Sequence, residues 1–191
     1  MLGLPMPADF SAVADASSLI VLAKVNALEI LYAVYGVVAI TDTVFREAVL
    51  VGQQLGKSDA WIIETALVRG LLTRISLTVE EEVLAQSYHS SNPSLDLGEC
   101  ESIALAESRS VPLIIEDRKA KALAKARDIV YTIVQMVPFE GYIDGKVSCA
   151  QCLELMERIA IAMGTDVAVL NGMKAAVEAL ESERQENKRD V

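Results

Sequence analysis

Short apolar runs that alternate with helix-forming stretches constrain the fold of this chain most strongly. Each run has the length of a strand, and the residues after it have the apolar spacing of a helix. Strands that alternate with helices pair in parallel, and the helices cover both faces of the sheet. The pattern therefore predicts an α/β protein with three layers, α/β/α, around a central, mostly parallel sheet. The predicted strands are Ser11–Asp15, Val37–Ile40, Leu71–Leu77 at a sheet edge, Leu113–Ile115 and Ile129–Val134.

Polar residues before the first helices support this prediction. Ser17 and Ser18 are expected to open a helix over Leu19–Lys24, because a serine hydroxyl can accept a hydrogen bond from a free backbone N–H group there. The segment Thr41–Thr43 is expected to cap a helix from Val44 to Val51 in the same way. Helices are thus expected directly after each of the first two strands.

The length of 191 residues fits one domain with a helical appendage, since domains run to roughly 100–200 residues. We expect an α/β domain over residues 1–137. A helical extension over residues 138–191 is expected to pack on that domain or on a partner. It should contain two amphipathic helices, Cys149–Met163 and Val167–Leu180, while the charged end, Glu181–Asp190, is expected to fray into solvent.

The composition excludes several kinds of site. The only histidine, His89, stands in a polar stretch predicted to be a loop, so sites that need paired imidazoles are excluded. The three cysteines, Cys100, Cys149 and Cys152, are an odd number and no secretory signal precedes them, which indicates reduced thiols in the cytoplasm. No apolar stretch approaches the ~18 residues of a membrane span. We therefore expect a cytoplasmic protein that does not enter a membrane.

Four acids are placed to meet at one edge of the predicted sheet. Asp15 closes the first strand and Asp117 follows the fourth. Glu47 lies one turn into the helix after the second strand, and Glu99 opens a helix predicted over Gly98–Arg109. In parallel sheets, ligands bind outside the carboxyl ends of the strands, where the strand order reverses. We expect the four carboxylates to converge there, although any one of them alone is better explained as a helix cap or a surface residue.

Converging carboxylates repel one another, and their pKa values rise unless a cation is present. Mg²⁺ or Mn²⁺ relieves this repulsion, because both ions prefer oxygen ligands. A carboxylate-held divalent ion, in a chain without a histidine pair or a serine nucleophile, suits phosphodiester hydrolysis. The acids therefore indicate a metal-dependent nuclease with Mg²⁺ or Mn²⁺ as its cofactor.

Four stretches of the sequence resemble PIN domains, the metal-dependent ribonucleases of toxin–antitoxin and RNA-processing systems. They occur in the order found in that family and span about Ala12 to Val137. The closest likeness is to a prokaryotic subgroup with a Gly-Glu-x-Glu helix and an Asp-Arg-Lys-Ala turn. The matching stretches are Val13–Ile20, Ile40–Val49, Leu97–Ala106 and Leu113–Lys121.

The resemblance also implies roles for individual residues. The positions of the family's four catalytic acids are occupied by Asp15, Glu47, Glu99 and Asp117, of which Asp15, Glu99 and Asp117 are the expected metal ligands. Glu99 stands where aspartate is commoner. The supporting residues are Ser17, beside the first acid, and Glu101 and Glu116, which are close enough in sequence to be ligands instead. Asp96, one turn before Glu99, is expected to cap the helix.

The charge distribution bears on the substrate. The formal net charge of −10 opposes contact with nucleic acid over most of the surface. Five cations nevertheless follow Asp117 within ten residues, and Arg118, Lys119 and Lys121 are the expected RNA contacts. An ordinary solvated helix face is the other interpretation. The remaining two cations are Lys125 and Arg127.

These observations predict a divalent-metal-dependent endoribonuclease that acts on single-stranded or structured RNA, as the toxin of a toxin–antitoxin pair. Its expected partners are RNA, a small antitoxin protein and a second copy of the chain. The alternatives are a weakly active or inactive PIN-like domain that serves protein association, and an RNA-processing nuclease without an antitoxin. The apolar C-terminal helices suit either a homodimer or the binding of an antitoxin helix.

Overall fold

The computed structural model describes residues 10–189. The first residues of the chain, in which we predicted no secretory signal, lie outside this range. Asp190, the last residue of the segment expected to fray, also lies outside it. Within that range, five strands form one sheet in the order β3-β2-β1-β4-β5, and every neighbouring pair is parallel. The predicted α/β/α fold is confirmed, with β3 at an edge. The strands are β1 (Ala12–Ala14), β2 (Val38–Thr41), β3 (Leu72–Ile75), β4 (Leu113–Ile114) and β5 (Tyr131–Thr132).

Helices make up most of the rest of the described chain. The segment that follows β2 is continuous, but its middle part, η1, is a π-helix. A short 3₁₀ turn, η2, follows β5. The bounds are α1 (Ala16–Lys24), α2 (Leu28–Tyr35), α3 (Asp42–Phe45), η1 (Arg46–Val51), α4 (Gly52–Gln54), α5 (Ser58–Val68), α6 (Val79–Ser91), α7 (Leu97–Arg109), α8 (Arg118–Ala126), η2 (Val134–Met136), α9 (Val137–Ile143), α10 (Cys149–Met163) and α11 (Val167–Arg189).

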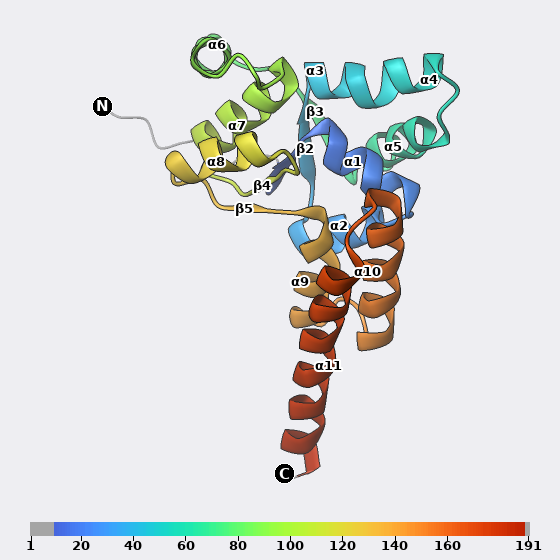
Figure 1. The fold of residues 1–191 in the computed structure, drawn as a ribbon. Helices are drawn as coiled ribbons and strands as arrows, with labels where there is room; N and C mark the ends of the chain where they lie inside the picture. Colours follow the sequence, from blue (N-terminus) through green and yellow to red (C-terminus); the bar gives the residue numbers. More distant parts are fainter. Residues whose placement is uncertain (1–9, 190–191) are drawn as a thin grey trace.

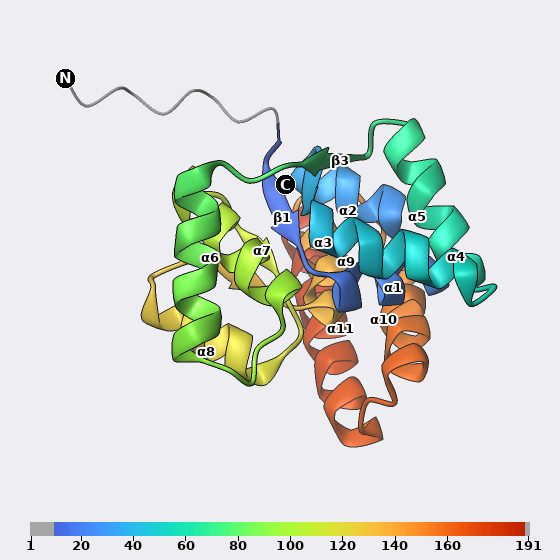
Figure 2. The same cartoon turned by 90° about the horizontal axis from the view of Figure 1, so that it is seen from above.

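The helices form two layers around the sheet. Helices α6, α7 and α8 lie on one face, and α1 to α5 lie on the other (Figures 1 and 2). Helices α9 and α10 pack against the second group, α9 on α2 and α10 on α1. Helix α11 packs on α10 and extends away from the sheet (Figure 1).

Alternating strand residues supply the two cores on either side of the sheet. In β1, Ala12 and Ala14 belong to the core shared with α1, α2 and α5, while Val13 belongs to the core shared with α6, α7 and α8. In β2, Val38 and Ile40 face the first core and Ala39 the second. Because side chains of a strand point to opposite faces in turn, strands buried on both faces are apolar throughout.

The topology creates one point where the strand order reverses. Strand β1 lies in the middle, with β2 and β3 on one side and β4 and β5 on the other. The chain fills the first side before it crosses to the second, so the reversal falls between β1 and β4. Asp15 directly follows β1 and Asp117 follows β4. Both acids are therefore at the place where open parallel sheets bind their ligands.

The expected start of the first helix is wrong. Helix α1 begins at Ala16 and its N-cap is Asp15, whose Oδ1 accepts a hydrogen bond from the Ser18 backbone N–H at 2.8 Å. Ser17 Oγ instead donates to Asp15 Oδ2 at 2.7 Å. Aspartate and serine are equally good caps, and Asp15 holds the position because its backbone is still extended at the end of β1.

His89 also differs from its prediction as a loop residue, because α6 continues to Ser91 and places His89 in its last turn. The imidazole Nδ1 lies 2.9 Å from the carbonyl oxygen of Leu95, in the loop that follows. This contact ties the end of α6 to the loop before α7. The histidine thus has a structural partner and lines no group of acids.

The charged end of the chain does not fray at Glu181. Helix α11 continues to Arg189 because its side chains bind the end of α9. The Tyr142 hydroxyl donates to Glu181 at 2.7 Å, and Arg184 donates to the carbonyl oxygens of Tyr142 and Ile143 at 3.2 and 3.1 Å. The Arg184 guanidinium also stacks over the Tyr142 ring, 4.4 Å from its centroid.

The helices of the described chain differ from a membrane span in length or composition. Between residues 10 and 189, no single helix is both long enough and apolar enough to cross a membrane. Helices α1 and α2 reach that length and apolar composition only when taken together, and they are bent by 120° at their junction.

Candidate acid site at the carboxyl edge of the sheet

Asp15 lies at the centre of the acids and is almost completely buried, with 2% of its surface exposed. Burial raises the pKa of its carboxyl group, and hydrogen bonds from Ser18 and Ser17 oppose part of that rise. The Ser18 hydroxyl is fully buried beside Asp15 and makes no hydrogen bond of ordinary geometry within the described chain. A buried carboxylate next to an unpaired hydroxyl is a polar site that the protein alone leaves incompletely satisfied.

Asp117 and Glu116 approach Asp15 from the loop after β4. Asp117 caps α8, with Oδ1 accepting hydrogen bonds from the backbone N–H groups of Lys119 and Ala120 at 2.7 and 2.9 Å. Only one of its carboxylate oxygens is used in this way. Glu116 accepts a hydrogen bond from the Val134 N–H. Its pKa is raised by burial and by the negative charge of Asp15, against the opposing effect of the Val134 N–H and of Lys121.

Glu99 reaches the same place from the first turn of α7. Asp96 caps this helix as predicted, since Asp96 Oδ1 accepts a hydrogen bond from Glu99 N–H at 2.7 Å. In return, Glu99 Oε2 accepts one from Asp96 N–H at 3.0 Å, which completes a capping box. Burial, together with the negative charges of Asp96, Asp117 and Asp15, raises the pKa of Glu99 to about 7.

Glu47 approaches the site from the π-helical segment η1. Its Oε2 lies against Gly98, where an added Cβ would be only 3.0 Å away. Glycine at that position of α7 therefore makes room for the carboxylate. Burial raises the pKa of Glu47, as do the charges of Asp96, Glu101 and Asp15, and Arg46 opposes them. Single π-turns inserted in α-helices occur frequently at functional sites.

Glu101 lies in the second turn of α7 and is held by a residue of α3. The Thr43 hydroxyl donates to Glu101 Oε1 at 2.8 Å. Sequence reasoning did not identify Thr43 or Gly98 as part of the site. The glycine had only a weak signal, its place in the Gly-Glu-x-Glu motif. Thr43 had none beyond its place near a helix start.

The structure brings the four predicted catalytic acids to one edge of the sheet. Asp15 acts electrostatically on Glu47, Glu99 and Glu116, and Asp117 acts on Glu99. Among residues 10–189, none of these groups forms an ion pair with arginine or lysine. The edge therefore carries a dense negative charge that the protein itself does not neutralise.

Among residues 10–189, the acid edge has the donor chemistry of a divalent-cation site without its closed arrangement of ligands. In the described part of the chain, no three Asp, Glu, His or Cys side chains surround one point as the ligands of a bound ion do. The chemistry of the donors nevertheless fits Mg²⁺ or Mn²⁺, since all are oxygens and their negative charge is in excess. Asp117 has a carboxylate oxygen outside its cap, and the buried Ser18 hydroxyl makes no hydrogen bond of ordinary geometry within residues 10–189.

The expected RNA-binding cations lie at different distances from the acids. Lys121 is half-buried and its charge acts on Glu116, so it lies beside the site. Arg118 and Lys119 are exposed on the first turn of α8. Arg127, by contrast, is paired with Glu107. The basic helix therefore presents its N-terminal half, and not its whole length, to the acid edge.

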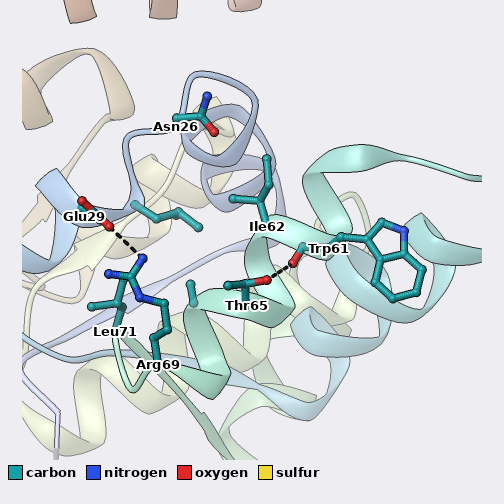
Figure 3. Close-up of a pocket in the computed structure, with 9 residues that line it drawn as sticks. Asn26, Glu29, Trp61, Ile62, Thr65, Arg69 and Leu71 are labelled. Carbon is teal, nitrogen blue, oxygen red and sulfur yellow. Dashed lines mark hydrogen bonds and ion pairs between the residues drawn. The ribbon is translucent and has the colours of Figure 1, made fainter.

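A cavity of about 410 Å³ lies elsewhere (Figure 3). It lies between α5 and the turn that joins α1 to α2, and Arg69 and Glu29 form an ion pair at its rim (Figure 3). None of the candidate acids lines it. We therefore place the chemistry at the acid edge and not in this cavity.

The three-layer fold and the carboxyl groups at its switch point define a class of α/β proteins with an acidic site outside a parallel sheet. The sequence matches the DUF3368 family, a PIN domain, over residues 11–161. Since this match covers well over half of the chain, the protein belongs to the PIN-domain family, as the sequence motifs predicted. The match extends into α10. No curated protein matches the chain. The family implies a nuclease-like fold and a nuclease type of hydrolase, and PIN domains generally use divalent metals.

Proposed function

We propose that this protein is a divalent-metal-dependent endoribonuclease. The observation that carries the proposal is the buried Asp15 at the switch point, within electrostatic reach of Glu47, Glu99 and Glu116, whose pKa values are raised. Charges of one sign are costly to hold together without a counter-ion. A site built this way in a PIN domain supports cation-dependent hydrolysis of phosphodiesters.

The roles of the acids follow from their positions. Asp15, Glu99 and Asp117 would hold Mg²⁺ or Mn²⁺, and Ser17 orients Asp15 through its 2.7 Å hydrogen bond. When bound, such an ion supplies activation of water and stabilisation of the leaving oxygen. Glu47 is left free of the cation, so its carboxylate is the group placed to accept a proton from water.

Binding of the RNA strand is assigned to the N-terminal half of α8. Arg118, Lys119 and Lys121 would contact backbone phosphates, which gives affinity without a sequence preference. The net charge of −10 restricts these contacts to that patch. We also propose a cytoplasmic location, supported by three free cysteines in the described chain.

The proposal is tested by cleavage of single-stranded RNA with and without Mn²⁺. We expect the wild-type chain to cleave, and Asp15→Asn and Asp117→Asn to lose at least a hundredfold in rate, a loss on the order of that seen when one stabilising group is removed from an active site. Asp128→Asn is the matched control, because Asp128 is exposed after α8 and has a φ of 57° that asparagine tolerates. Cleavage that persists in both site variants, or in excess chelator, contradicts the proposal.

A toxin role and protein partners belong to the same proposal. Apolar side chains at the α10–α11 junction are exposed, with Ile161 at 76%, Val167 at 69% and Val169 at 54%. Exposed apolar groups of this density support association with another chain, either a small antitoxin or a second copy. If neither metal binding nor cleavage is found, the same surface favours a PIN-like domain that acts in protein association.

A further inference from the structure

Thr43 makes a contact that joins two elements of the acid site. It lies in α3, is 7% exposed, and its Oγ1 donates to Glu101 Oε1 of α7 at 2.8 Å. Among residues 10–189, no other side-chain hydrogen bond joins the α3–η1 segment to α7. Threonine hydroxyls inside helices commonly bond back to a carbonyl of their own helix. Here the hydroxyl reaches a different element instead.

The bond sets the direction of Glu101. Residues two apart on a helix point roughly 200° away from each other, so Glu99 and Glu101 leave α7 on different faces. Glu99 turns toward Asp96 and acts on Asp15 and Asp117. Glu101 turns toward α3, where its Oε1 is occupied by Thr43. Its second oxygen remains available on that flank.

Glu47 lies on the same flank as Glu101. The negative charge of Glu101 acts on Glu47, and Glu47 Oε2 sits against Gly98 in the turn of α7 that precedes Glu101. Glu47 is in turn within electrostatic reach of Asp15. Asp96 acts on both Glu47 and Glu99, so the pair of Glu47 and Glu101 adjoins the acids around Asp15.

We propose that Thr43 is a positioning residue that holds Glu101 as a fifth acid of the site, where it contributes to binding of the divalent cation. The proposal rests on the proposed metal-dependent function. It assigns to Glu101 a part in cation affinity and to Thr43 the task of fixing its orientation. Hydrogen-bond partners of metal-binding groups typically change affinity by about 10–100-fold when removed.

The test measures Mn²⁺ affinity by isothermal titration calorimetry on chelator-treated protein, without RNA. We expect Thr43→Val to weaken Mn²⁺ binding by about tenfold, and Thr43→Ser, which keeps the hydroxyl, to retain wild-type affinity. Glu101→Gln should weaken binding at least as much as Thr43→Val. The double variant should be no weaker than Glu101→Gln alone, because Thr43 acts only through Glu101.

Three results overturn the inference. Wild-type Mn²⁺ affinity in Thr43→Val overturns it, and so do losses that multiply in the double variant. Unchanged Mn²⁺ affinity in Glu101→Gln also overturns the inference. This variant provides the test if the buried Thr43→Val change prevents folding. Loss of cleavage in Asp15→Asn alongside unchanged Mn²⁺ binding in the Thr43 and Glu101 variants rejects this inference alone. A wild-type chain that neither binds Mn²⁺ nor cleaves RNA rejects the proposed function with it.

Discussion

Asp15 combines a local structural task with a charge that the structure does not otherwise need. As an N-cap it requires only an acceptor for the Ser18 N–H, which an asparagine side chain also provides. Its negative charge, in contrast, is buried among other acids. The charge therefore has a purpose other than capping, and the two tasks can be separated by substitution.

The first prediction concerns Asp15→Asn. In the absence of metal we expect the melting temperature to be unchanged or to rise by about 2–4 °C, the shift that roughly 1 kcal/mol produces in a domain of this size. The rise in melting temperature that Mn²⁺ causes in the wild type should be lost. Differential scanning fluorimetry with and without Mn²⁺ measures both effects, with Asp128→Asn as control. A wild-type Mn²⁺ response in Asp15→Asn would speak against this assignment.

Gly98 allows a second prediction at the residue scale. An alanine Cβ there would lie 3.0 Å from Glu47 Oε2, so Gly98→Ala should displace that carboxylate. Because a small misplacement of a catalytic group costs up to about a hundredfold in rate, we expect cleavage to fall at least tenfold. The melting temperature should change little, because the atom that must move is the far end of a flexible side chain.

Gly172 provides the matched control for this change. It is also helical, but an added Cβ there meets nothing within 4 Å. Gly172→Ala should keep the wild-type cleavage rate. Steady-state cleavage rates and melting temperatures of the two variants are the measurements. Equal rates for both would show that the close approach of Gly98 and Glu47 has no part in the reaction.

The raised pKa values give a third prediction. Burial raises the pKa of Asp15. Burial and the charges of neighbouring acids raise the pKa values of Glu47 and Glu116, and that of Glu99 to about 7. The folded state thus holds protons that the unfolded state, with carboxyl pKa values of about 4, has released. The stability of the metal-free protein should fall as the pH rises from about 4.5 to about 7.

Thermal melts across this pH range in chelator measure the effect. Glu99→Gln should flatten the profile, because the amide cannot ionise. Saturating Mn²⁺ should also flatten it by favouring the ionised carboxylates. A metal-free stability that increases steadily with pH would be the opposite of what these groups require.

At the scale of elements, the sequence predicts which segments form strands and which form helices, because buried strands and amphipathic helices differ in the spacing of their apolar residues. It also places Asp15, Glu47, Glu99 and Asp117 at one edge, since parallel strands all end there. Contacts between elements produce no such pattern in the sequence. The Thr43–Glu101 bond joins residues 58 positions apart, and the π-helix around Glu47 has the same apolar spacing as an α-helix over so few residues.

The end of α11 is a second case in which a contact between elements could not be predicted from the sequence. It gives a fourth prediction. Its charged composition indicates fraying, yet Arg184 binds two carbonyl oxygens of α9 and stacks on Tyr142. We expect Arg184→Ala to lower hydrogen-exchange protection in the last turns of α11 and the melting temperature by about 2–4 °C. The exposed neighbour Glu183→Ala should change neither. Unchanged protection in Arg184→Ala would mean that other contacts hold the tail.

For the whole molecule, the net charge of −10 and the proposed RNA substrate are compatible only if the charges are segregated. The acids of the site gather at the switch point, while Arg118, Lys119 and Lys121 stand at the start of the adjacent α8. RNA would meet a small basic patch beside the acids and an acidic surface elsewhere. Affinity should therefore depend on few phosphate contacts and show a shallow dependence on salt.

The last prediction tests this segregation with Lys121→Gln. Fluorescence anisotropy of a labelled single-stranded RNA, measured in an Asp15→Asn background to prevent cleavage, gives the affinity at several salt concentrations. Loss of one phosphate contact should lower affinity and reduce the slope of log K against log salt by about 0.7. Lys146→Gln, an equal charge change at an exposed loop position, should leave both unchanged. If the two variants lose affinity equally, RNA responds to the net charge of the protein and not to the patch beside Asp117.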